Sequence, residues 1–74
     1  MYWRSKPEIS SRQKSFFADA AVDIQNLPTS TTEGTPQQVD PEAHKCVDIG
    51  SDCVVIATGD VYILGSNGWA VLGG

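Results

Sequence analysis

The most strongly patterned part of the chain is residues 52–74, where apolar runs are separated by two turn signals. Gly59-Asp60 suits a two-residue type II′ hairpin, and Asn67-Gly68 is the usual type I′ pair. Together they predict a three-strand antiparallel β-meander. The register follows if the residues that flank each turn pair with one another: Thr58 with Val61, and Ser66 with Trp69.

In this register both faces of the meander are apolar. One face carries Val55, Ala57, Tyr62, Leu64, Trp69 and Val71. The other carries Val54, Ile56, Val61, Ile63, Ala70 and Leu72. A sheet with one solvated face alternates apolar and polar residues, so we expect both sides of this sheet to be covered.

Residues 15–27 fit two kinds of element. Their apolar residues recur at helical spacing, with Ser15 as a possible cap and Pro28 as a stop, which predicts a short helix. The stretch from Ala21 to Gln25 also alternates at period two, as a short strand does. We favour the helix, which would bury its apolar stripe against the meander.

Between this segment and the meander lies a stretch with loop chemistry. Residues 28–42 are rich in Thr, Ser, Pro, Gly and Gln and predict a linker loop. After it, Ala43 to Ile49 predicts a first, weaker strand, which extends the meander unit to residues 43–74. The expected fold is therefore mainly β, a small antiparallel meander of three to four strands with one short helix and an extended N-terminal arm.

The N-terminal arm is predicted from the distribution of charge. Residues 1–14 hold four basic residues against one acid, whereas residues 15–74 hold one lysine against eight acids. A basic segment on an acidic body is typical of a tail that seeks a partner. We expect the arm to anchor the protein through its basic and aromatic side chains: Tyr2, Trp3, Arg4, Lys6, Arg12 and Lys14.

The sequence offers little chemistry. His44, Cys46 and Cys53 are three potential zinc ligands without a fourth at a usual spacing, so we expect no metal and no cofactor. We expect free thiols, although a turn at Gly50-Ser51 leaves a disulfide open. His44 has no evident nucleophile partner, which predicts no catalytic residue and no enzyme. We expect no nucleic-acid binding, because the acidic body would repel phosphate.

The small size of the chain favours assembly. Seventy-four residues bury a limited core, and small domains often gain stability from oligomerisation. No apolar run reaches the roughly 20 residues of a membrane span, and the start lacks the apolar core of a signal peptide. We therefore expect no membrane association and synthesis in a reducing compartment.

Two further motifs carry a resemblance to a known class of proteins. One runs from Asp23 through Leu27-Pro28-Thr29-Ser30. The other runs from Ile49-Gly50-Ser51 through Thr58-Gly59-Asp60-Val61-Tyr62 to Gly65-Ser66-Asn67-Gly68-Trp69. This pattern resembles small virion structural proteins of tailed bacteriophages, of the head-fibre, decoration or neck type. The resemblance covers about residues 22–70 and implies a virion location after synthesis in the host cytoplasm, with no catalytic residues.

These observations predict a structural subunit of a phage virion. It would be a homo-oligomer, with a trimer favoured, anchored by its arm to other virion chains of the capsid, portal, neck or fibre. The predicted oligomer interface is the first apolar face of the meander: Val55, Tyr62, Leu64, Trp69 and Val71. The alternative is a small soluble binding module, encoded by a phage, that acts on a host protein.

Overall fold

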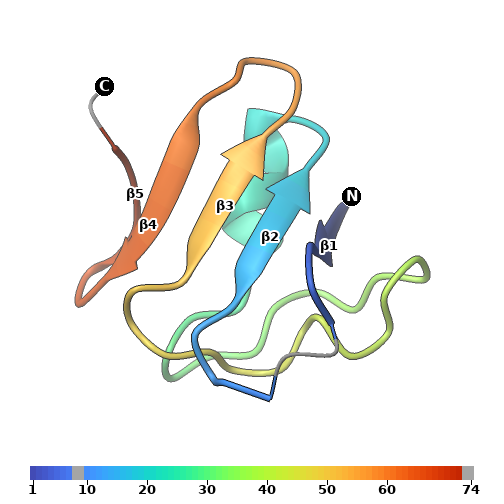
Figure 1. The fold of residues 1–74 in the computed structure, drawn as a ribbon, viewed down its shortest axis with the longest axis vertical. Coiled ribbons are helices and arrows are strands. Elements are labelled where there is room, and N and C mark those ends of the chain that lie inside the picture. The colour runs from blue at the N-terminus through green and yellow to red at the C-terminus, as the bar shows by residue number, and fades with distance from the viewer. Residues whose placement is uncertain (8–9, 73–74) are drawn as a thin grey trace.

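The computed structural model describes residues 1–7 and 10–72 as one mixed sheet with a single short helix. The sheet order is β1-β2-β3-β4-β5 (Figure 1). The strands are β1 (Tyr2–Arg4), β2 (Ser15–Ala18), β3 (Asp52–Val55), β4 (Val61–Gly65) and β5 (Gly68–Val71), and the 3-10 helix is η1 (Ala21–Asn26). The expectation of a mainly β fold with a C-terminal meander is confirmed, with five strands instead of three or four.

One strand pair departs from the expected antiparallel pattern. β2 runs parallel to β3, while the other three neighbouring pairs are antiparallel. Parallel neighbours need a crossover connection, because the chain must return to the starting end of the sheet. Here the crossover is residues 19–51, which comprise η1 and the following loop and which we call the crossover segment. In Figure 1 its helix lies behind the sheet.

The crossover segment supplies the second layer of the hydrophobic core. Leu27, Ala43 and Val47 are each at most 4% exposed and belong to the same buried cluster as Phe16 and Leu64 of the sheet. Buried polar groups of this layer are paired: the Trp69 indole N–H donates to the Pro28 carbonyl at 2.9 Å. One face of the sheet is therefore covered within the chain.

Both hairpins of the meander have a different register from the predicted one. Val54, not Thr58, pairs with Val61, so residues 56–60 form a longer connection with Gly59 at φ +76°. Gly65 pairs with Gly68, which leaves Ser66 and Asn67 in the turn and a positive φ of 109° at Gly68. A glycine with positive φ directly after the turn residues is a common way to end a hairpin turn.

The predicted N-terminal arm is incorporated into the sheet. Tyr2 is fully buried, and its ring packs edge-on against Phe16 with 6.0 Å between the centroids. The Tyr2 hydroxyl donates to the Thr35 carbonyl at 2.7 Å, which ties β1 to the crossover segment. The prediction of an extended arm is therefore wrong at Tyr2–Arg4, which form β1. Residues 8 and 9 of the predicted arm, and residues 73 and 74 of the meander, lie outside the described residues.

Two other segments differ from expectation in detail. Residues 15–27 contain both candidate elements, the strand β2 followed by the helix η1. The strand expected from Ala43 to Ile49 is absent from the described structure, where this stretch consists of turns and extended backbone. Its Ala43 and Val47 are buried as part of the crossover segment instead.

Candidate interaction surface

The face of the sheet opposite the crossover segment is uncovered and mostly apolar, with Ser15 and Asp52 as polar residues on β2 and β3. Pairing places Trp3 beside Phe17, Phe17 beside Val54, and Val54 beside Val61. The row continues to Leu72, whose amide donates to the Val61 carbonyl at 2.7 Å. We call this face, with the additional residues Ile63 and Ala70, the open face. In Figure 1 no described segment lies in front of it.

The side chains of the open face remain partly accessible to solvent. Leu72 is 63% exposed, and the central residues Phe17, Val54 and Val61 are each of intermediate burial. Trp3 and Phe17 form a cross-strand aromatic pair with 6.2 Å between ring centroids. A contiguous apolar surface that crosses a whole sheet is typical of a site for protein association.

The residues predicted as an oligomer interface lie on the other face. Val55 is fully buried and Leu64 is 1% exposed, so the structure places both in the core of the chain rather than on a surface. Tyr62 and Trp69 are partly buried against that core. Only Val71, at 44% exposure, is freely accessible among the five. The crossover segment thus covers the face that sequence reasoning assigned to a neighbouring subunit.

The predicted anchoring residues are distributed over several environments. Arg4 forms a two-bond ion pair with Asp40, with Nη2 to Oδ1 at 2.7 Å and Nε to Oδ2 at 2.9 Å. This guanidinium holds the pKa of the Asp40 carboxyl below its usual range. Arg12 pairs with Asp48 at 3.0 Å, and Lys6 is exposed. The six residues do not form one surface, because Tyr2 is in the core and Trp3 is on the open face.

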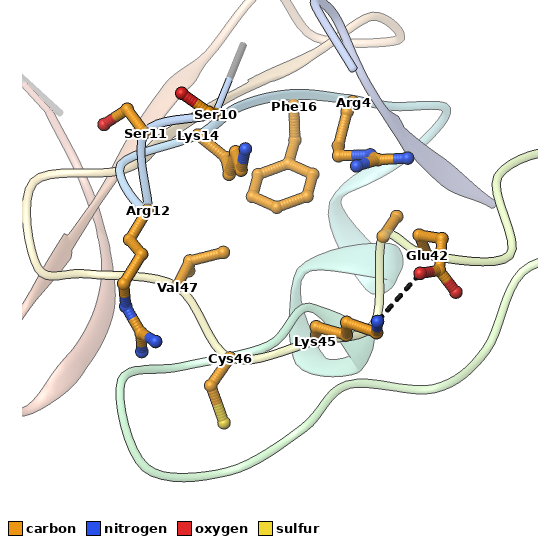
Figure 2. Close-up of a pocket in the computed structure, with 11 residues that line it drawn as sticks. Arg4, Ser10, Ser11, Arg12, Lys14, Phe16, Glu42, Lys45, Cys46 and Val47 are labelled. Carbon is orange, nitrogen blue, oxygen red and sulfur yellow. Dashed lines mark ion pairs between the residues drawn. The ribbon is translucent and has the colours of Figure 1, made fainter. Parts of the chain in front are cut away.

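A hollow of about 330 Å³ lies between the Ser10–Lys14 stretch and residues 42–47 (Figure 2). The buried ring of Phe16 lies at its centre, with Arg12 on one side and the Lys45–Glu42 ion pair on the other. Its lining includes four basic side chains: Arg4, Arg12, Lys14 and Lys45. Three of these already pair with a carboxylate, at Asp40, Asp48 and Glu42. The hollow therefore presents little uncompensated positive charge.

The candidate chemical groups lie in separate places. Cys46 and Cys53 are free thiols; Cys53 is fully buried, and burial raises its pKa to about 12, which makes it a poor nucleophile at neutral pH. The His44 ring Nδ1 lies 2.8 Å from the Pro41 carbonyl. Among residues 1–7 and 10–72, no group of three or more His, Cys, Asp or Glu side chains is arranged to hold a metal.

Three comparisons with known proteins were negative. No protein-family model, no curated protein and no solved structure matches it. In the described part of the chain, no helix has the length and apolar character that crossing a membrane requires. The interaction surface therefore has to be interpreted from its own geometry.

Proposed function

We propose that this protein is a structural, self-associating β-subunit whose open face is an assembly surface. The observation that carries the proposal is the unbroken apolar row from Trp3 to Leu72, which is in register across β1 to β4 and ends at Leu72, directly after β5. The crossover segment has already covered the other face, so the chain has no described layer left for this one.

The energetics favour association through this face. Removing a large apolar side chain fully from water contributes about 1.5–3 kcal/mol, and the partly exposed side chains of the open face would each contribute a fraction of that. Two sheets that pack face to face lie about 10 Å apart and interdigitate their side chains. An apolar sheet surface is suited to such packing.

The setting that we propose for this subunit is the virion of a tailed bacteriophage. The proposal follows the resemblance of residues 22–70 to small head-fibre, decoration and neck proteins. Its support is that a structural role needs a compact fold and a contact surface, both of which the described structure has. The partners would then be further copies of this chain and other virion proteins.

Self-association is tested by measuring the mass of the particle in solution, for the wild-type chain and for two double variants. The wild-type chain should exceed the mass of one copy by light scattering at micromolar concentration. Val54→Thr with Val61→Thr keeps strand-forming side chains of similar size but introduces hydroxyls into the open face. We expect the dissociation constant to rise at least tenfold, which corresponds to about 1.4 kcal/mol.

The matched control replaces two valines that lie away from the sheet. Val22 and Val39 are 64% and 54% exposed, so Val22→Thr with Val39→Thr makes the same chemical change at solvated positions. This control should leave the mass unchanged. A wild-type chain that stays a folded monomer would overturn self-association and favour the alternative, a binding module that presents the open face to a host protein.

A further inference from the structure

The two edge strands of the sheet, β1 and β5, differ in whether their outward backbone groups are hydrogen-bonded. At one edge, β1 directs the amides of Tyr2 and Arg4 outward, because Met1 and Ser5 make the ladder bonds to β2. The Gln37 side chain accepts from the Tyr2 amide at 3.2 Å, and Asp40 accepts from the Arg4 amide at 3.0 Å. This edge is therefore capped by the crossover segment and closed to further strands.

At the other edge, β5 has no such cap. The amide of Leu72 bonds to Val61, so in the alternation of an antiparallel ladder Trp69 and Val71 direct their N–H and C=O groups away from β4. Within the part of the chain that the structure describes, the outward N–H and C=O groups of Trp69 and Val71 form no hydrogen bond with another segment. β5 also carries no charged residue that would discourage pairing.

The side chains along β5 are self-complementary about Ala70. An antiparallel copy centred on Ala70 would place Trp69 opposite Val71 of the second copy, both on the side of the sheet that holds the core. It would place Leu72 opposite Gly68, whose missing side chain leaves room for the leucine. The two accessible apolar residues at this edge, Val71 and Leu72, would each gain a cross-strand neighbour.

We propose that β5 pairs with β5 of a second copy, antiparallel about a two-fold axis at Ala70, to form one continuous ten-stranded sheet. Trp69 and Val71 then exchange both backbone hydrogen bonds with Val71 and Trp69 of the other copy. The open faces of the two copies become one surface. This contact rests on the proposed function and adds a second contact to it, because edge pairing leaves the joined open faces free to pack against another pair of copies.

A cysteine at the axis tests the register directly. Two Ala70 residues would form a non-hydrogen-bonded pair with Cα atoms about 4.5 Å apart, which lies within the range that a disulfide spans. Ala70→Cys in a Cys46→Ser background should give a covalent dimer on mild oxidation; the buried Cys53 can remain. Thr58→Cys in the same background is the control, because residue 58 is exposed in the β3–β4 loop. It should give little covalent dimer.

A proline at the edge tests the hydrogen bonds. The outward amide of Val71 is not needed for the ladder to β4, so Val71→Pro removes an intermolecular donor and leaves the chain's own sheet bonds in place. We expect at least tenfold weaker association. Val71→Thr, which keeps the amide, should stay within about threefold of wild type. Circular dichroism and thermal unfolding check that each variant folds. If Val71→Pro does not fold, the Ala70→Cys cross-linking experiment alone decides whether β5 pairs with β5.

The outcomes separate the edge contact from self-association itself. Efficient Ala70→Cys cross-linking with a dissociated Val71→Pro variant supports the two-fold pairing. A wild-type oligomer that resists Val71→Pro and cross-links no better through residue 70 than through residue 58 overturns the pairing but leaves the proposed function standing. A trimer that cross-links no better through residue 70 than through residue 58 likewise overturns the pairing and leaves the proposed function standing. A wild-type chain that remains single at all concentrations overturns both, and leaves β5 for a strand of another protein.

Discussion

At the residue scale, the Arg4–Asp40 pair joins the first strand to the crossover segment. The Asp40 carboxylate accepts from the Arg4 side chain and from the Arg4 backbone, so it satisfies a charge and caps the sheet edge at once. Both side chains are less than one-fifth exposed. A charge-assisted pair with two parallel bonds in such a place is worth more than an exposed ion pair.

This pair should make stability depend on pH. The pKa of Asp40 is lowered, mainly by its hydrogen bonds with the Arg4 side chain. A carboxyl whose folded pKa lies below its unfolded value of about 3.9 contributes stability above that value, and the contribution is lost as pH falls through the folded pKa. Asp40→Asn should therefore lower the free energy of unfolding by about 1.5–3 kcal/mol at pH 7. The difference from wild type should shrink steadily below pH 4.

Chemical denaturation at one fixed protein concentration measures this effect at both ends of the pH range. Asp60→Asn is the control, since Asp60 is exposed in the β3–β4 loop. It should differ little from wild type at either pH. An Asp40→Asn deficit that is equally large at pH 7 and pH 3 would contradict an origin in the carboxylate charge.

At the scale of elements, the close approach of the crossover segment to β1 depends on a glycine. A Cβ atom on Gly34 would lie 2.7 Å from both the Pro28 nitrogen and the Tyr2 hydroxyl oxygen. The backbone atoms in this contact cannot move aside as a flexible side chain can. Gly34→Ala should therefore destabilise the fold by about 1–3 kcal/mol, the usual cost of overpacking.

Gly65→Ala provides a matched control for this substitution. Gly65 is also of intermediate burial, but a Cβ there would meet its nearest neighbour at 3.7 Å, an ordinary contact. Thermal unfolding should show a clear drop in midpoint for Gly34→Ala and a small change for Gly65→Ala. Equal midpoints for the two variants would mean that the crossover segment can shift away from Tyr2 without loss.

The elements also show which parts of the fold the sequence could predict. The assumed hairpin registers were displaced by four and by two residues along the partner strand. Because both displacements are even, the meander residues that lie in strands kept their faces, whereas Ile56 and Ala57 fall in the β3–β4 loop. Turn residues place a hairpin approximately, whereas the alternation of side chains fixes the faces independently. The two-sided apolar character of the sheet was therefore predictable, although the pairing was not.

Other elements depend on contacts that local patterns do not contain. β2 pairs with β3 across a crossover segment of residues 19–51, and β1 has only three residues. Ala43 and Val47 have the spacing of residues on one face of a strand. They are instead buried in the core from a segment of turns and extended backbone. Two of the predicted interface residues, Val55 and Leu64, are buried for the same reason, because the segment interpreted as a linker covers their face. Tyr2 and Leu27 are buried in the same core, and the residues adjacent to each in the sequence do not predict that contact.

At the scale of the whole molecule, the apolar surfaces must overcome the repulsion between like-charged copies. The chain carries a net charge of −4, with a calculated isoelectric point near 4.5. β5 carries no charged residue, so association through this strand and the open face would bring two acidic bodies together without ion pairs along that edge. Repulsion between exposed charges falls as salt shortens the Debye length from about 30 Å at 0.01 M to about 3 Å at 1 M.

Self-association should therefore strengthen as salt is added. We expect the dissociation constant, measured by sedimentation at pH 7.5, to fall several-fold between 0.02 M and 0.5 M sodium chloride, with most of the change below 0.2 M. Lowering the pH toward 4.5 at low salt should act in the same direction, because it removes net charge. The Val54→Thr, Val61→Thr double variant should show the same salt trend from a weaker starting point. Dissociation on adding salt would instead mean that ion pairs hold the copies together, and that the apolar face is not the surface through which they meet.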